Sequence, residues 1–298
     1  MSRTKQLKFD EIGYWSQIKL DIVKDYASAY SQILAAQAKP ALHHVYIDAF
    51  AGVGVHVSKA TGEYVPGSPV NALLVRPPFR EYHLIDIDGQ KAALLRELTA
   101  GQPNVYAHEG DCNSILLNRV FPQICYEEYR RGLCLLDPYG LHLDWKVIQK
   151  AGQMRSIELF INFPVADINR NVLWRNPEGV DEADVARMNA FWGDDSWRQV
   201  AYQSEPGLFG DIVEKKDNEA VAEGFRQRLK AVAGFKYVPD PTPMRNSKGA
   251  VVYYLFFASQ KPVAAKIVRN IFNKYRNRGM NRWPIAQKSN GLRQRGIQ

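Results

Sequence analysis

The sequence has few cysteines and no long apolar run. Cys112, Cys125 and Cys134 form no CxxC pair and lie among apolar neighbours, so we expect small core residues rather than a disulfide or a zinc site. No apolar segment approaches the roughly 20 residues of a membrane helix. The first residues, MSRTKQLKFDE, lack the apolar core of a signal peptide. We therefore expect a cytoplasmic protein with no membrane partner.

Common nucleotide-binding signatures are missing as well. The phosphate loop GxxxxGK[ST] does not occur, which disfavours a nucleoside triphosphatase. Gly52 and Gly54 form a GxG pair, but Val57 stands where the third glycine of a dinucleotide fingerprint belongs. Asp86 follows Gly52 by 34 residues (86 minus 52), whereas the fingerprint places its acid about 20 residues on. A nicotinamide cofactor is therefore disfavoured, and the absence of a repeat argues against a solenoid.

Composition and charge place the chain among globular proteins. Of its 298 residues, 46% are hydrophobic and 23% are charged, which excludes disorder, collagen and a coiled coil. Residues 274–298 hold seven basic and no acidic side chains, so 1–273 carry 32 minus 31, or +1, of the total +8. We therefore expect one large domain, 1–273, and a basic C-terminal tail, 274–298. The tail favours a polyanion partner such as nucleic acid, or it is a solvated end.

Hydrophobic patterns predict strands that alternate with helices. An amphipathic helix over 14–38 precedes the first strand. The expected strands are 43–50, 81–86, 104–111, 132–137, 156–164, 235–241 and 251–259. The expected helices between and after them are 69–75, 90–100, 113–128, 144–153, 217–232 and 262–275. Ser68 and Pro69 mark the start of the first of these helices. The alternation predicts an α/β fold with a mostly parallel seven-stranded sheet, an antiparallel final strand and helices on both faces. A polar, apparently helical insertion, 165–213, follows the fifth strand as a lid or substrate-side segment.

Chemistry-bearing residues stand at the ends of four successive strands. The first strand ends in DAFAGVG with Asp48, and the second in Asp86 and Ile87. The third ends in Asp111 and Cys112, and the fourth in DPYG with Asp137. Because ligands of such sheets lie at the carboxyl ends of the strands, these motifs predict a shared binding site. Each motif alone is equally typical of a turn or a helix cap.

This arrangement resembles the class I S-adenosylmethionine-dependent methyltransferases, with their Rossmann-like fold. The segments YIDAFAGVG, GSP, LIDID and LLDPYG resemble more narrowly the three-Cys-motif partner protein family, TcmP. The resemblance implies S-adenosyl-L-methionine as cofactor. The end of the first strand would face its methionine part, the end of the second strand its ribose, and the end of the third strand its adenine. The cofactor-binding residues implied are Asp48, Phe50, Ala51, Gly52, Gly54, Asp86, Ile87, Asp111 and Cys112.

The DPYG segment suggests the reaction. In methyltransferases that act on the amino groups of bases, a similar motif offers a carboxylate and a proline carbonyl as hydrogen-bond acceptors, and an aromatic ring stacks on the base. Asp137, Pro138 and Tyr139 match these catalytic roles, although the motif has one proline and the tyrosine comes one position early. The target base would have to be flipped out or single stranded. A strand-ending turn with a packed tyrosine is the structural alternative.

Weaker candidates surround these motifs. Asn162 at the end of the fifth strand either touches the substrate or stabilises a turn. The six histidines show no metal-ligand spacing, so neither a metal nor a histidine base is expected. Lys19 and Lys24 either close the cofactor site or form a solvated helix face. Three tryptophans with neighbouring arginines offer a stacking surface or belong to the core: Trp174, Trp192 and Trp197, with Arg175, Arg187 and Arg198.

The sequence therefore favours a methyltransferase that modifies an exocyclic amine of a nucleobase in DNA or RNA. No metal or covalent intermediate is implied, because direct transfer needs mainly positioning and electrostatics. Two alternatives stay open. One is a cofactor-binding partner subunit of a multiprotein system, and the other is a methyltransferase of small molecules.

Overall fold

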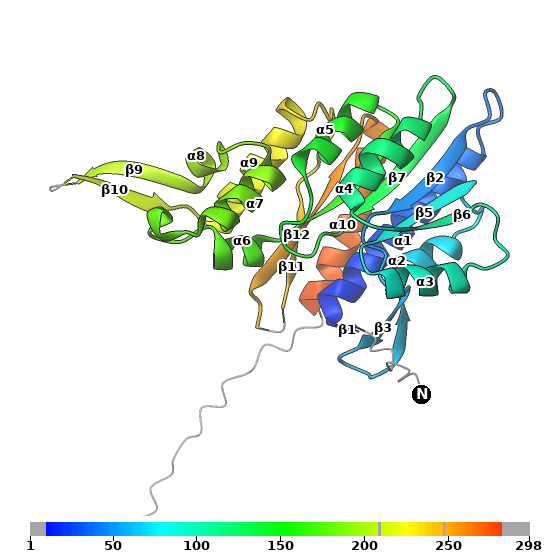
Figure 1. Ribbon diagram of the computed structural model, residues 1–298, viewed down its shortest axis with the longest axis horizontal. Coiled ribbons are helices and arrows are strands. Elements are labelled where there is room, and N and C mark those ends of the chain that lie inside the picture. Colours follow the sequence, from blue (N-terminus) through cyan, green and yellow to red (C-terminus); the bar gives the residue numbers. More distant parts are fainter. Residues whose placement is uncertain (1–9, 208–209, 247, 282–298) are drawn as a thin grey trace, which may run out of the picture.

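A seven-stranded sheet forms the centre of the computed structural model, which describes residues 10–207, 210–246 and 248–281 (Figure 1). Its strand order is β11-β12-β8-β7-β2-β5-β6. In that order the strands are Thr242–Arg245, Val251–Ala258, Ile157–Phe163, Arg130–Leu136, His43–Asp48, Glu81–Asp86 and Val105–Glu109. Five neighbouring strands run parallel to one another: β6, β5, β2, β7 and β8. The next strand, β12, runs antiparallel to β8, and β11 runs antiparallel to β12.

This topology confirms the α/β, Rossmann-like methyltransferase fold expected from the sequence, antiparallel final strand included. The chain winds outward in one direction through β2, β5 and β6, then returns to begin the other half at β7. The strand order therefore reverses between β2 and β7. Doubly wound sheets bind their ligands at the carboxyl ends of the strands beside such a reversal.

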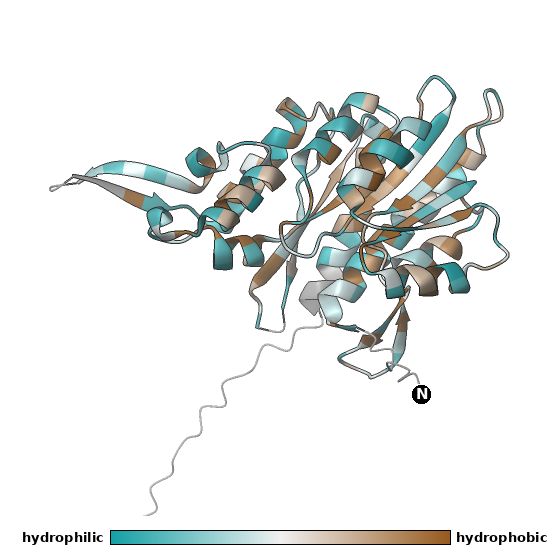
Figure 2. Ribbon diagram, in the orientation of Figure 1, coloured by the Kyte–Doolittle hydropathy of each residue, from teal (hydrophilic) through white to brown (hydrophobic). Residues whose placement is uncertain are grey.

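Helices cover both faces of the sheet. On one face lie α1 (Tyr14–Ala35), α2 (Ser68–Leu73), α3 (Gly89–Leu98) and α10 (Pro262–Asn281), which share one hydrophobic cluster with the sheet. On the other lie α4 (Cys112–Ile115), α5 (Trp145–Met154) and α9 (Asn218–Ala231). Figure 2 shows the hydrophobic sheet between helices whose outer sides are hydrophilic. Each strand therefore has apolar side chains on both faces, as parallel sheets require.

The insertion is helical only in part. It contains α6 (Val165–Asn171), α7 (Glu182–Trp192) and α8 (Trp197–Ala201). It then forms a hairpin, β9 (Tyr202–Gly207) and β10 (Gly210–Lys215), that projects from the body in Figure 1. The sequence prediction missed this hairpin because its exposed residues show no apolar alternation.

The strand expected over 235–241 is also displaced. The structure places β11 at Thr242–Arg245, while Tyr237 makes only an isolated bridge with Ser259. Pro239 and Pro241 lack the N–H groups that a strand donates, so pairing begins after them. Pro243 is tolerated in β11 because that strand lies at the edge of the sheet.

Two further elements differ from the expectation. A small sheet of β1 (Glu11–Ile12), β3 (Val55–Ser58) and β4 (Tyr64–Pro66) covers the glycine-containing loop after β2. The helix expected over 113–128 is short, because α4 continues as a π-helical turn (Leu116–Val120) and a 3-10 turn (Phe121–Gln123).

The last helix, α10, extends beyond its expected end and runs back along α1. Lys274 Nζ lies 2.6 Å from Asp25 Oδ2 of α1, and Figure 1 shows the end of α10 beside the beginning of α1. The first part of the basic segment is therefore helical, while 282–298 lie outside the described residues. Within the ranges given above, no helix is both long and apolar enough to span a membrane.

Candidate active site

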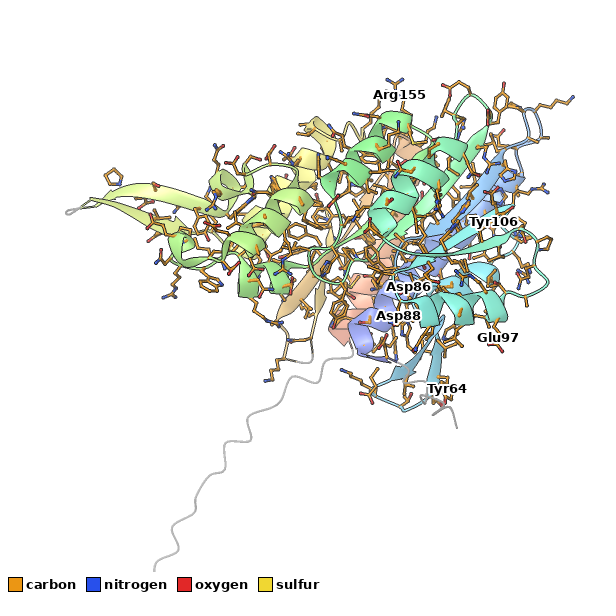
Figure 3. All side chains as sticks on the ribbon, viewed as in Figure 1. Tyr64, Asp86, Asp88, Glu97, Tyr106 and Arg155 are labelled. Carbon is orange, nitrogen blue, oxygen red and sulfur yellow. The ribbon has the colours of Figure 1, made fainter. Side chains whose placement is uncertain are left out.

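The ends of β2, β5, β6 and β7 surround a cavity of about 520 Å³, which we call the rim cavity. Its lining residues are Ala49, Phe50, Asp86, Ile87, Gly110, Asp111, Cys112, Asn113, Tyr139, Leu141, His142, Asp144, Arg187 and Ala190. Figure 3 shows Asp86 and Asp88 at this carboxyl edge of the sheet and Arg155 at the opposite edge. Six residues predicted for the site therefore share one cavity: Phe50, Asp86, Ile87, Asp111, Cys112 and Tyr139.

Asp86 is held by backbone groups at the end of β5. Its Oδ2 accepts a hydrogen bond from Gly52 N at 2.9 Å, and its Oδ1 accepts one from Asp88 N at 2.8 Å. Gly52 has a φ of +65°, in the left-handed region that glycine adopts without strain, and the space where a Cβ would stand is open. Each oxygen of Asp86 keeps a lone pair free, so the carboxylate can accept further hydrogen bonds from a ligand.

Asp111 and Cys112 begin α4 beside this carboxylate. Asp111 caps the helix, because its Oδ2 accepts a hydrogen bond from Ser114 N at 2.8 Å. Burial raises the pKa of the Cys112 thiol to about 12, and the neighbouring Asp111 adds to the shift. Cys112 is therefore a neutral apolar wall of the rim cavity rather than a nucleophile.

Asp48 lies beneath the rim cavity and does not line it. The carboxyl is fully buried, and it accepts hydrogen bonds from Phe50 N at 3.3 Å and Tyr46 Oη at 3.4 Å. Burial and, to a lesser extent, the neighbouring Asp137 raise the pKa of Asp48 to about 7, although a hydrogen bond with Ser68 opposes the shift. Ser68 therefore serves Asp48 instead of capping α2, whose N-cap is Gly67. Asp48 supports the loop that leads to the site.

Asp137 in the DPYG segment forms a partly buried ion pair and does not line the rim cavity. Its Oδ2 contacts the Nζ of Lys19, which comes from the sheet-facing side of α1 and is only 8% exposed. Lys19 is thus not a solvated residue, and it does not line the rim cavity. Lys24 is exposed, as expected for a solvated helix face. The predicted residues Ala51, Gly52, Gly54 and Pro138 also do not line the cavity.

The rest of the DPYG segment turns outward. The Tyr139 side chain is 91% exposed at the mouth of the rim cavity, so the packed tyrosine of the structural alternative is not what the fold contains. Gly140 has a φ of +64°, and a Cβ there would approach Asp167 of α6 to 2.9 Å. A glycine is therefore needed for the turn that exposes Tyr139. Asn162 is buried at the end of β8, and its Oδ1 has no hydrogen-bond partner.

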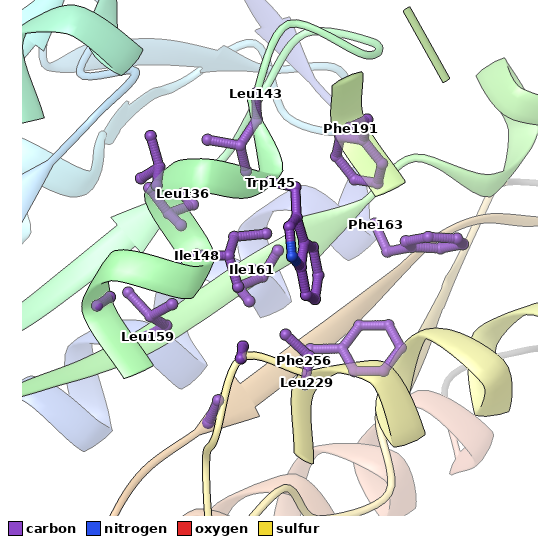
Figure 4. Close-up of a cluster of buried hydrophobic side chains, with 14 of the residues drawn as sticks. Leu136, Leu143, Trp145, Ile148, Leu159, Ile161, Phe163, Phe191, Leu229 and Phe256 are labelled. Atoms are coloured by element: carbon purple, nitrogen blue, oxygen red, sulfur yellow. The ribbon is translucent and has the colours of Figure 1, made fainter. Parts of the chain in front are cut away.

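The insertion supplies one wall of the rim cavity through Arg187 and Ala190 of α7. This helix is anchored in the core, since the ring of Phe191 stacks on Phe225 at 5.7 Å between centroids, and Phe225 lies 4.7 Å from Phe163. Figure 4 shows Phe191 close to Trp145 and Phe163. The part of the insertion that borders the cavity is therefore a packed wall rather than a hinged lid.

The tryptophans of the insertion divide between core and surface. Trp192 and Trp197 are buried, as expected if they belong to the core. Trp174 is 43% exposed, and its ring N–H donates to the Arg170 carbonyl at 2.7 Å. A stacking surface on the insertion is thus restricted to Trp174.

Several lining residues were not identified in the sequence. Asn113, His142 and Asp144 reach the rim cavity from α4 and from the loop after β7. Asn113 ties these segments together, because its Oδ1 accepts from Asp144 N at 2.8 Å and its Nδ2 donates to the His142 carbonyl at 3.3 Å. The polar residues that follow Asp111 and DPYG were the available signal. Across the described ranges no cluster of three or more acidic, histidine or cysteine side chains is arranged to hold a metal ion.

Comparisons with known proteins give weak similarities. No family model matches the chain, and no curated protein matches it. Among solved structures, a Legionella pneumophila protein described under the family DUF519 is 14% identical with a TM-score of 0.48, and the match covers 87% of this chain and 93% of that one. A SAM-dependent methyltransferase of Leishmania major is 10% identical with a TM-score of 0.36, over 81% and 72% of the two chains. The 23S rRNA methyltransferase ErmE is 13% identical with a TM-score of 0.33, over 89% and 83%. At these values the similarities carry no argument about function, and the fold assignment rests on the strand order.

Proposed function

We propose that the protein is an S-adenosylmethionine-dependent methyltransferase that modifies an exocyclic amino group of a nucleobase. The observation that carries this proposal is the rim cavity itself. It joins Asp86, Ile87, Asp111 and Cys112 at the carboxyl edge of a sheet with the methyltransferase strand order. These are the positions that the sequence resemblance assigns to the ribose and the adenine.

The chemistry of the rim cavity fits this cofactor. Asp86, Asp111 and Asp144 line it, whereas its arginine, Arg187, forms an ion pair with Asp184. Carboxylates repel the phosphates of nucleotide cofactors but favour a ligand that carries a sulfonium and no phosphate. The free lone pairs of Asp86 suit two vicinal ribose hydroxyls. Apolar groups of Ile87 and Cys112 suit the faces of an adenine ring.

The DPYG segment would position the acceptor. Asp137 and the Pro138 carbonyl would accept hydrogen bonds from the two hydrogens of an amino group, which directs the nitrogen lone pair outward. Exposed Tyr139 would stack on the base. Bound S-adenosylmethionine would supply an electrophilic methyl group. The target base would reach this pocket from a single strand or after it is flipped out of a duplex.

A nucleic-acid substrate is supported by charge and by the placement of α10. This helix holds the first residues of the basic segment, and it ends beside the beginning of α1, whose Lys19 reaches the DPYG segment. The insertion, in contrast, holds four basic and nine acidic side chains, or −5 over 165–213. We therefore assign the phosphate contacts to the basic segment rather than to the insertion. Binding should weaken steeply as salt increases, because counterions are released from phosphates.

A role as a subunit is the second candidate. The resemblance to three-Cys-motif partner proteins favours it, since that family name implies a neighbouring protein partner. In that case the chain would bind the cofactor but transfer no methyl group alone.

Calorimetry of S-adenosylmethionine and S-adenosylhomocysteine binding tests the cofactor. We expect wild-type protein to bind both and Asp86→Ala to bind roughly 100-fold more weakly, because two hydrogen bonds to a charged acceptor contribute about 1.5–3 kcal/mol each. Asp88→Ala is the matched control. Asp88 caps α3 through Gln90 N at 2.8 Å, so its loss should lower stability by about 1 kcal/mol and leave binding intact.

Radiolabel transfer to separate DNA, RNA and small-molecule pools then tests the reaction. Transfer to one nucleic acid by the purified chain would support the proposal and count against the subunit role. Cofactor binding without any transfer would favour the subunit role, and transfer to small molecules alone would overturn the assigned substrate. If folded wild-type protein bound neither ligand, the cofactor assignment would be wrong for the isolated chain.

A further inference from the structure

The ion pair between Lys19 and Asp137 has an unusual setting. The Lys19 ammonium is buried between α1 and the sheet, and it lies 5.3 Å from the centre of the Tyr253 ring on β12. The Asp137 side chain is 25% exposed, and its Oδ2 contacts the Nζ of Lys19. A lysine is seldom buried to this extent unless it is paired. The pairing is therefore part of how the DPYG segment is held.

A second carboxyl group lies next to this pair. Asp48 is the Cα partner of Leu135 in the parallel pairing of β2 with β7, two residues before Asp137. Because side chains alternate along a strand, Leu135 and Asp137 project toward the same face of the sheet as Asp48, the face covered by α1. The carboxyls of Asp48 and Asp137 are thus neighbours on adjacent strands, and Lys19 is the cation beside both.

The titratable groups that face these carboxyls come from five elements. They are Lys19 of α1, Tyr46 of β2, His56 of β3, Cys134 of β7 and Tyr253 of β12. Burial lowers the pKa of His56, so its imidazole is neutral at pH 7, and burial raises the pKa of both tyrosines, which stay neutral. Lys19 therefore supplies the positive charge. We call Lys19, Asp48, Asp137 and Tyr253 the Lys19 cluster.

We propose that Lys19 is a positioning residue for methyl transfer, which holds one oxygen of Asp137 and so fixes the orientation of that side chain. The other oxygen of Asp137 is then left to accept a hydrogen bond from the target amine. Without the ammonium, Asp137 loses the side chain that holds it, and its second oxygen is no longer aligned with the amine. This role rests on the proposed function.

Steady-state kinetics of methyl transfer test the role. Wild type, Lys19→Met and Lys19→Arg are compared at pH 7 on pooled RNA and DNA, and Lys24→Met on the exposed side of α1 is the control. We expect Lys19→Met to lose about tenfold or more of kcat while KM for the nucleic acid stays within about threefold, because the substrate still binds but the acceptor oxygen is misaligned. Lys19→Arg should restore much of kcat, since a cation can again hold Asp137. A wild-type kcat in Lys19→Met would overturn the proposal.

An unfolding cycle tests the pair without any activity. The denaturation midpoints of Lys19→Met, Asp137→Asn and the double variant are measured at pH 7 together with their calorimetric affinity for S-adenosylmethionine. The double variant should be no less stable than Lys19→Met, because a partner left alone is an uncompensated buried charge. Additive losses would contradict the coupling. If the wild type transfers no methyl group to any pool, the proposed function fails and this role with it, whereas a normal wild type with additive losses removes the role of Lys19 alone.

Discussion

The rim cavity and the Lys19 cluster lie at the same edge of the sheet, and both are built from aspartates that end strands. In the rim cavity, Asp86 and Asp111 are open to ligand and hold mainly backbone N–H groups. In the Lys19 cluster, Asp48 is fully buried and Asp137 is paired with an ammonium. The accessible pair is suited to bind a ligand directly. In the Lys19 cluster, the ion pair instead orients Asp137 beside the place where the methyl group would be transferred.

This difference shows that the residue type does not fix the role of a strand-ending aspartate. The four motifs are alike in sequence, but Lys19 of α1 pairs with Asp137 and lies beside Asp48, at the ends of β7 and β2. Water reaches Asp86 and Asp111, whereas helices α1 and α2 cover Asp48. Three variants test whether the two regions act as separate units.

The largest effect is expected at Asp137. Asp137→Ala should lower methyl transfer about 100-fold or more, since an acceptor beside the reacting nitrogen is lost, and it should leave S-adenosylmethionine affinity within about threefold. Asp137→Asn is the matched variant, because both substitutions leave Lys19 unpaired but only asparagine keeps an acceptor oxygen. Kinetics and calorimetry on both variants separate the two regions. Equal activity of wild type and Asp137→Ala would show that the DPYG segment is only a turn.

A smaller effect is expected at Asp48, where substitution should change how the free energy of unfolding depends on pH. Its pKa is about 7 in the native state and near 3.8 when unfolded, so between these values only the native carboxyl keeps its proton. The contribution of Asp48 to the free energy of unfolding is therefore complete below about pH 4 and is lost as pH rises through 7. Asp48→Asn cannot ionise, so we expect its stability relative to wild type to improve by roughly 2–4 kcal/mol from pH 4 to pH 8.

Chemical denaturation of both proteins at pH 4, 6 and 8 measures this difference. Asp86→Asn serves as the control, because it makes the same substitution at a strand-ending carboxyl that is only partly buried. If the stability difference between Asp48→Asn and wild type stayed constant with pH, Asp48 would not be the buried titrating group that the structure indicates.

The smallest effect is expected at Arg187. Arg187→Ala should weaken S-adenosylmethionine binding about threefold, since a half-exposed side chain at the border of the rim cavity contributes under about 1 kcal/mol. Arg198→Ala is the control within the same insertion, because Arg198 lies over the Trp197 ring at 4.5 Å and outside the rim cavity. Unequal affinities of the two variants in calorimetry would support α7 as a wall of the site. Identical affinities would restrict the cofactor site to the sheet edge.

Much of the fold could be predicted because its signals are local. The strand 81–86 was predicted with its observed bounds, and the helix beginning at Tyr14 with its observed start, since both follow a clear apolar period. The hairpin β9–β10 could not be predicted, because its strands pair through backbone groups and residues 203–206 of β9 are exposed, with no apolar alternation. The predicted position of the edge strand β11 was wrong, because the prediction followed the apolar pattern of 235–241. Pro239 and Pro241 in that segment lack the N–H groups that a strand donates.

The site divides in the same way. Strand-end motifs predicted Asp86, Ile87, Asp111 and Cys112 as neighbours, because consecutive parallel strands bring their carboxyl ends together. Arg187 was named only as part of a stacking surface and Ala190 not at all, since they reach the rim cavity only through the packing of α7 against Phe163 and Phe225.

Short-range signals were enough to predict the elements of the central sheet, the strand-end motifs and the basic segment, because periodicity, turn residues and charge are properties of short segments. Long-range packing was needed to separate the open aspartates from the buried ones and to bring Lys19 to Asp137 across 118 positions of the chain. Burial and ion pairing depend on groups that lie far apart in sequence. The free energy of a charge therefore becomes defined only when the helices close over the sheet.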